Sequence, residues 1–278
     1  MMVADKVRAP YTLTAALAAL MVVQSMLGLL FPGEYRDAEW IKATWFGNDC
    51  VTLVVAGPLM VIALLAARRG SVKGMLLWLG LLGYAAYNYA YYLLGAALNT
   101  FFLLYVVALV LSVVTLIVAL SRLEVADVVA CFRPTTPVRI IGGYLAFVGF
   151  GLGSVWITMW AAYAFAGRPT PVEPQAFKLV AALDLSLMVT ALTSGGVLLW
   201  RRSSWGYVVA AIAGIQGSLY LLVLSVNSIV AVHRGLAKAP GELPLWGTLA
   251  VFTTAVTLLL FTNIHRKRFP PVRSGVGL

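Results

Sequence analysis

The chain has 278 residues, of which 62% are hydrophobic and only 11% are charged. A soluble domain averages about 25% charged residues, so this composition excludes a water-soluble globular protein and predicts an integral membrane protein. The net charge of +10 comes from Lys and Arg residues that lie between apolar runs, a pattern typical of membrane topology and of contact with anionic lipid headgroups rather than of nucleic-acid binding.

The lengths of the apolar runs predict the fold class. A transmembrane helix needs about 20 apolar residues, and eight runs qualify: Tyr11–Phe31, Asp49–Ala67, Met75–Leu94, Phe101–Leu120, Ile140–Phe165, Leu179–Trp200, Trp205–Val232 and Leu245–Ile264. The third and fourth runs are nearly continuous, so we predict a turn near Gly95–Asn99. The expected fold is an all-α, polytopic membrane helix bundle in a lipid bilayer.

The positions of the positive charges predict the orientation. With the N-terminus in the cytoplasm, the inner segments hold fourteen Lys and Arg residues and the outer segments hold six. The positive-inside rule then predicts that both termini are cytoplasmic, with a disordered tail from Phe269 onward. Arg outnumbers Lys by fourteen to six, which favours the cell membrane of a bacterium, that is, its inner membrane.

The segment between the first two runs, residues 32–47, alternates aromatic and charged side chains. This pattern favours an aromatic belt that anchors the first two helices. A short amphipathic helix in the membrane interface is the alternative. Within the spans, Pro58 removes a backbone donor and predicts a kink near Val54, while Gly149 and Gly153 predict a close helix–helix contact.

The two halves of the chain share an order of features. Asp49 precedes Arg68-Arg69 by 19 residues, and Asp184 precedes Arg201-Arg202 by 17. Each double-Arg turn leads into a helix with Gly and Tyr in its outer half. We therefore predict a duplication, with four-helix repeats at residues 1–125 and 126–278. Four is an even number, so the repeats would be parallel, related by an axis along the membrane normal, with room for a cavity between them.

Polar side chains inside the third and seventh runs are candidates for a site. Tyr84, Tyr87, Asn88 and Tyr91 are spaced by three and four residues and share one helix face. In the seventh run, Gln216 and Tyr220 are four apart. Tyr84 and Asn88 lie too deep for an interfacial belt, so their polar groups need partners inside the bundle or water in a cavity. Both interpretations, helix–helix hydrogen bonding and a polar pocket, stay open.

Asp49 and Asp184 are the acidic residues in or at the predicted spans. For Asp49 the favoured interpretation is a helix N-cap. Asp184 lies six residues past Lys178, inside the membrane, where a charge costs about 2.5–3.5 kcal/mol unless the group is neutral, hydrogen-bonded or open to water. We expect Asp184 to face an outward-opening polar cavity with Tyr87, Asn88, Gln216 and Tyr220 and to bind a cation, a proton or a polar group there, unless it simply begins its helix near the surface. The candidate ligand- or ion-binding residues are Asp184, Asp49, Tyr87, Asn88, Tyr84, Gln216 and Tyr220.

Three classes of function fit this pattern. A transporter or channel-like protein for a small solute or ion is favoured, because short loops, parallel halves and a polar centre are typical of such proteins. A sensor or scaffold subunit with a ligand pocket is the alternative. A membrane enzyme acting on a lipid or quinone-like substrate is less favoured, because no convergent catalytic set is present. His233 and His265 lie at helix ends on opposite sides, so no metal or other cofactor is expected. The sequence makes no prediction of oligomeric state.

Overall fold

The computed structural model describes residues 2–236 and 241–265, with side chains from residue 9 onward. The tail predicted from Phe269 onward lies outside the described residues. Within them the chain is helical, with no β-strand. In chain order the elements are α1 (Met2–Leu30), η1 (Pro32–Glu34), α2 (Glu39–Val51), η2 (Thr52–Ala56), α3 (Gly57–Arg68), α4 (Val72–Gly95), α5 (Phe102–Ser121), α6 (Val125–Val129), α7 (Val138–Ala166), α8 (Pro174–Leu183), η3 (Asp184–Val189), α9 (Thr190–Trp200), α10 (Ser204–His233) and α11 (Leu243–Thr262).

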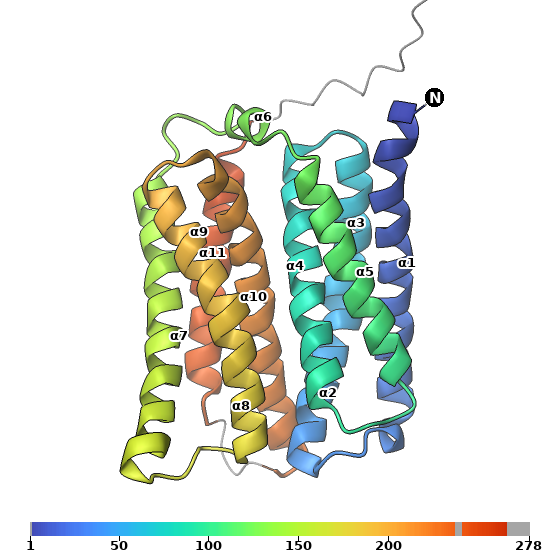
Figure 1. Ribbon diagram of the computed structural model, residues 1–278, viewed down its shortest axis with the longest axis vertical. Coiled ribbons are helices and arrows are strands. Elements are labelled where there is room, and N and C mark those ends of the chain that lie inside the picture. The colour runs from blue at the N-terminus through green and yellow to red at the C-terminus, as the bar shows by residue number, and fades with distance from the viewer. Residues whose placement is uncertain (1, 237–240, 266–278) are drawn as a thin grey trace, which may run out of the picture.

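Seven of the described helical segments are long and apolar enough to cross a membrane. They are Ala9–Leu30, Glu39–Arg68, Phe102–Ser121, Val138–Ala166, Pro174–Trp200, Ser204–His233 and Leu243–Thr262. The remaining long helix, α4, has 24 residues and runs alongside them (Figure 1), but its tyrosines and Asn88 make it less apolar. The chain is therefore a multi-pass, all-α membrane protein, and α4 corresponds to the third predicted run.

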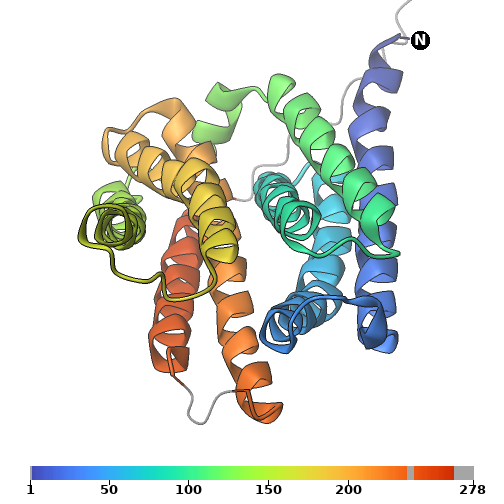
Figure 2. The ribbon, with the colours of Figure 1, turned by 60° about the horizontal axis from the view of Figure 1, so that its bottom comes forward.

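The helices form two groups that lie side by side. Figures 1 and 2 both show α1–α5 on one side and α7–α11 on the other, with the short helix α6 joining them at the end where the chain begins. Helix α10 packs against both α2 and α4 and so forms most of the contact between the groups. Both double-Arg turns lie at the α6 end of the bundle, which we call the Arg-rich face.

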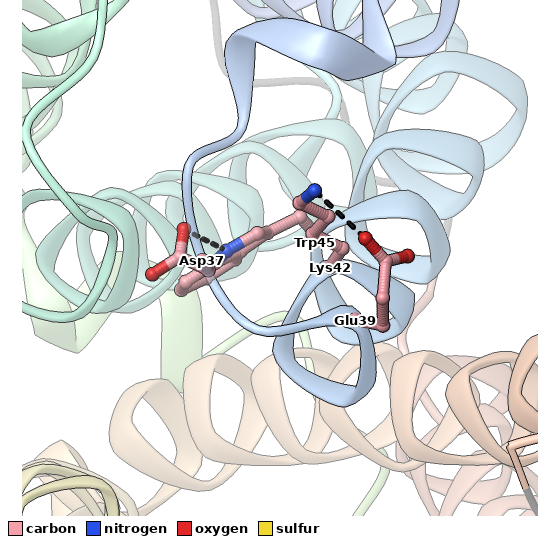
Figure 3. A network of polar contacts seen from close by, with 4 residues as sticks. All are labelled: Asp37, Glu39, Lys42 and Trp45. Atoms are coloured by element: carbon pink, nitrogen blue, oxygen red, sulfur yellow. Dashed lines mark hydrogen bonds and ion pairs between the residues drawn. The ribbon is translucent and has the colours of Figure 1, made fainter.

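Two predictions about the second span are wrong. The helix begins at Glu39 and continues to Arg68 through η2, so Asp49 lies inside it and is not an N-cap. Residues 39–47 are its first turns and do not form a separate interfacial helix. Trp45 is buried and its indole donates to Asp37 at 2.9 Å, while Lys42 pairs with Glu39 (Figure 3). These contacts allow the helix to begin at Glu39, ten residues before Asp49, where the apolar run starts.

Two π-helical turns interrupt the second and sixth spans, at η2 and η3. In a π-turn the backbone N–H bonds the carbonyl five residues back, and Gly57 N–H donates to Thr52 O in this way. Pro58 follows directly and lacks an N–H, which explains the irregular turn around Val54. No proline follows η3; there the Thr190 hydroxyl donates to the Leu185 carbonyl at 3.0 Å.

Glycines allow α7 and α9 to cross at close range. A Cβ placed on Gly142 would collide with the Gly196 carbonyl and the Trp200 amide, and one on Gly149 would collide with Thr193. A Cβ on Gly153 would only touch Val189. The contact predicted at Gly149 and Gly153 is thus present, and it continues about two turns toward the Arg-rich face, where the atoms nearest to Gly142 belong to the backbone of α9. This crossing fixes α7 and α9 rigidly together.

The orientation prediction is tested with single cysteines at Ser204 and Gly235, which are both exposed and lie at opposite ends of α10. In a background with Cys50 and Cys131 replaced by Ala, a membrane-impermeant thiol reagent on intact cells should label position 235 and spare position 204. The cysteine-free background must stay unlabelled. Labelling at position 204 alone would place the Arg-rich face outside and reverse the topology.

The close crossing predicts a large difference between two glycines of α7. Gly142→Ala should lower the free energy of unfolding by about 1–3 kcal/mol, the range for overpacked sites, because backbone atoms of α9 cannot move away. Gly151→Ala is the matched control, since a Cβ there meets nothing within 4 Å and alanine has the higher helix propensity. Unfolding in mixed micelles measures both. Equal stability of the two variants would contradict the close approach.

Candidate functional site

The Asp184 carboxyl group is completely buried and receives three hydrogen bonds. The Tyr87 hydroxyl donates to Oδ1 at 2.5 Å, and the Trp156 indole and the Tyr220 hydroxyl donate to Oδ2 at 2.9 and 2.8 Å. The rings of Tyr87 and Tyr220 meet edge to face with centroids 5.4 Å apart. Trp156 and Tyr220 belong to α7 and α10, whereas Tyr87 belongs to α4. The site therefore draws donors from both groups of helices.

The Asp49 carboxyl group is also completely buried and has a matching set of donors. Gln24 Nε2 and the Tyr92 hydroxyl donate to Oδ1 at 3.1 and 2.8 Å, and the Tyr35 hydroxyl donates to Oδ2 at 2.6 Å. The Tyr89 hydroxyl donates to Gln24 Oε1 at 3.3 Å and so extends the network. All of these donors lie in the first group of helices or in the loop that joins α1 to α2.

Both carboxyl groups occupy the same place in their helices. Asp49 lies ten residues after Glu39, where α2 begins, and Asp184 lies ten residues after Pro174, where α8 begins. At 1.5 Å per residue each is about 15 Å along its helix. A π-turn begins three residues after Asp49 and at Asp184 itself. The similar sequence spacing from each Asp to its double-Arg turn thus corresponds to a similar position of the two carboxyl groups along their helices.

A short loop covers the Asp49 network on the side away from the Arg-rich face. Tyr35 is only 1% exposed, and burial raises its pKa well above the usual value, so its hydroxyl stays a neutral donor. The loop is held by Asp37, which accepts from Ala97 N–H at 2.9 Å, and by Glu34, which accepts from Thr100 at 2.7 Å. Gly28 leaves the space that the Asp49–Tyr35 contact fills, because a Cβ there would collide with both groups.

Two of the candidate residues make no hydrogen bond to Asp184 in the described part of the chain, Tyr84 and Asn88. The Tyr84 hydroxyl bonds Thr52 of η2 at 3.1 Å, and the Tyr91 hydroxyl bonds Thr44 of α2 at 3.3 Å. Asn88 follows Tyr87 on α4. It is 2% exposed, and its Nδ2 has no hydrogen-bond partner within the described residues. Tyr84 thus joins α4 to η2, and Asn88 stays a candidate without a ligand contact.

The cavity expected around Asp184 is not present in this conformation. Asp184 has no exposed surface, and Tyr87 and Asn88 are also buried, so the carboxyl group faces donors instead of water. Gln216 is buried, with its Oε1 against Gly83 of α4. The protein satisfies Asp184 by close packing, which removes the need for a water-filled space. Of the four residues expected around Asp184, the structure brings Tyr87 and Tyr220 onto it.

Several residues of these networks escaped the sequence reasoning, namely Gln24, Tyr35, Tyr92 and Trp156. A tryptophan near the middle of a span is unusual, because interfacial tryptophans lie at the ends and a buried indole needs an acceptor. The same reasoning applies to Gln24, a polar residue well inside the first run. Tyr35 carries no such signal, since it lies in a loop and only the fold brings it to Asp49.

Both carboxyl groups accept their hydrogen bonds from uncharged side chains. Among the side chains described, those of residues 9–236 and 241–265, the salt bridge found is the surface pair Lys42–Glu39. In the same part of the chain no group of three His, Cys, Asp or Glu residues is placed to hold a metal ion. Asp49 and Asp184 are therefore each held by neutral hydrogen-bond donors, a setting in which a proton or a monovalent cation is the natural counter-charge.

The Asp49 network predicts that Tyr35 contributes to stability. Tyr35→Phe should lower the free energy of unfolding by about 1–3 kcal/mol, because a buried carboxyl group loses one donor. Tyr163→Phe is the matched control, since Tyr163 is 49% exposed and should change the free energy by less than about 0.5 kcal/mol. Chemical unfolding in mixed micelles measures both. A loss equal in the two variants would show that the Tyr35 hydroxyl does not support Asp49.

Comparisons with known proteins do not identify a function for this chain. No protein-family model matches the chain, and neither a curated protein nor a solved structure is detectably similar to it.

Proposed function

We propose that this membrane protein is a transporter or channel-like protein for a small solute or ion, in which Asp184 binds a proton or a monovalent cation. The observation that carries the proposal is the position of Asp184 between the two groups of helices. Its carboxyl group accepts from Tyr87 on one side and from Trp156 and Tyr220 on the other. We call the contact between the two groups of helices, α1–α5 and α7–α11, the seam. Gain or loss of a charge at Asp184 changes hydrogen bonds on both sides of this seam at once.

The π-turn at Asp184 supports the proposal. Single π-turns inside α-helices are frequent at functional sites, because they leave backbone groups without their regular partners. Here the hydroxyls of Ser186 and Thr190 donate to the Ala182 and Leu185 carbonyls. Those hydroxyls lie on the exposed side of the helix, so the oxygen ligand that a monovalent cation or a proton relay would use is the buried Asp184 carboxylate. The surrounding phenols and indole hold the carboxyl group in place.

We further infer that residues 1–125 and 126–278 are parallel repeats, and the proposed mechanism uses this symmetry. In each half a buried Asp lies ten residues into its helix beside a π-turn, and a double-Arg turn follows. Each Asp accepts from the first and third long helices of its own half, through Gln24 and Tyr92 or through Trp156 and Tyr220. Transporters built from parallel halves bind their ligand at the repeat interface, where Asp184 lies.

Flux through purified protein in liposomes tests the proposal. The liposomes contain a pH-sensitive dye, and a potassium diffusion potential drives protons; separate runs impose Na⁺ or K⁺ gradients. We expect wild-type protein to conduct in at least one run and Asp184→Asn to conduct no better than empty liposomes, because the amide keeps the shape but cannot ionise. The matched control is Asp127→Asn, since Asp127 is exposed on α6 and its loss leaves the seam intact.

Two results would overturn the assignment. Full flux through Asp184→Asn at every pH would show that its carboxyl group has no role in conduction. Wild-type protein that conducts no protons, Na⁺ or K⁺ above empty liposomes would remove the ion-coupled transporter and leave the sensor or scaffold class.

A further inference from the structure

A cleft of about 320 Å³ opens on the Arg-rich face of the second group of helices. It is formed by residues 134–140, which lead into α7, and by Arg202 in the turn between α9 and α10. Arg139 and Arg202 line it from different elements, and the exposed Thr135 adds polar surface. No acidic side chain lines the cleft, and neither arginine has an ion-pair partner in the described part of the chain.

Arg202 occupies a backbone position that favours glycine. Its φ is 56°, which makes it the non-glycine residue with a left-handed conformation among those described. The corresponding turn in the first half has Gly70 at this place, with φ 76°. In both turns the residue follows the helix C-cap, Arg69 or Arg201, and precedes the serine N-cap of the next helix, Ser71 or Ser203. The second half thus has an arginine at a backbone position where the left-handed conformation favours glycine.

The cleft borders on exposed apolar surface. Ile140 lines it and is 67% exposed, and Trp200 and Trp205 are 52% and 45% exposed. The Trp200 indole lies against Gly143, which is one helical turn from Arg139 along α7. Two arginines therefore lie next to an exposed aromatic and aliphatic surface, and exposed tryptophans of this kind are typical of the membrane interface. Because Gly142 joins α7 closely to α9, this arrangement is rigid.

We propose that this cleft binds the phosphate of an anionic phospholipid headgroup, with the acyl chains along Ile140 and Trp200. Arginine binds phosphate oxygens through paired, charge-assisted hydrogen bonds, and basic clefts between transmembrane helices hold anionic lipid headgroups. Free phosphate would use the same guanidinium groups. The lipid is the occupant that also accounts for the exposed apolar border. The site is independent of Asp184 and of the proposed transport function.

Native mass spectrometry of the full-length protein in detergent tests the site with two probes, phosphatidylglycerol and phosphatidylcholine. Wild-type protein should retain one phosphatidylglycerol in preference to phosphatidylcholine. Arg139→Gln and Arg202→Gly should each weaken its retention about tenfold, since each removes a charge-assisted contact. Gly70 shows that the turn accommodates glycine, so Arg202→Gly keeps the fold, which circular dichroism verifies. Arg69→Gln is the control, because it removes the same charge from the same face at an exposed position outside the cleft.

Three outcomes would overturn the proposal. Equal losses in Arg69→Gln and Arg202→Gly would show general charge attraction instead of a site. Equal retention of both lipids by wild-type protein would show that the anionic headgroup is not recognised. Displacement of the lipid by millimolar inorganic phosphate would show that the cleft takes phosphate from solution and would reject the lipid as its occupant.

Discussion

A carboxyl group inside a bilayer needs hydrogen-bond donors, and the supply of donors to Asp49 and Asp184 shapes this bundle. Helix α4 serves both groups, because Tyr92 donates to Asp49 while Tyr87 donates to Asp184. The two tyrosines are five residues apart and therefore point to different sides of the helix. Because α4 supplies hydrogen-bond donors to both carboxyl groups, it is rich in tyrosine, less apolar than the other long helices and buried on nearly every side. Its place between the two groups of helices follows from the same requirement.

The two carboxyl groups differ in what their hydrogen bonds connect. Asp49 is enclosed by donors of its own half, and Tyr35 covers it from a loop that Asp37 and Glu34 hold down. Asp184 has no such loop and takes its third donor, Tyr87, from the other half. Breaking the contacts of Asp49 would loosen one half internally, whereas breaking the Tyr87 contact would loosen the seam. The proposed ion-binding role therefore rests on Asp184, and Asp49 acts as a fixed centre within the first half.

The sequence predicts the helical membrane fold well because the length of an apolar run reports directly on the thickness of the bilayer. The predicted turn at Gly95–Asn99 lies where α4 ends and α5 has not yet begun. Tyr220 could be associated with Asp184 because both are polar groups inside apolar runs. The start of the second span at Glu39 was missed, because helix ends extend beyond the apolar core when loop side chains such as Asp37 hold them. The sequence does not determine which neighbour Asn88 contacts, because a stripe on one helix does not show which partner helix each residue faces.

The π-turns give a physical reason why each Asp lies where it does. A π-turn contains one residue more than an α-helical turn, so it rotates the helix beyond it relative to the helix before it. Asp49 lies in α2, before its π-turn, and Asp184 is the first residue of η3, while α3 and α9 beyond the turns pack against α4 and α10. In the second span Pro58 stabilises the irregular turn, and in the sixth span the Thr190 hydroxyl does. A hydroxyl can exchange its acceptor, whereas a proline has no N–H to donate, so the two turns differ in what holds them. That difference supports the proposal that the ion binds at Asp184 and not at Asp49.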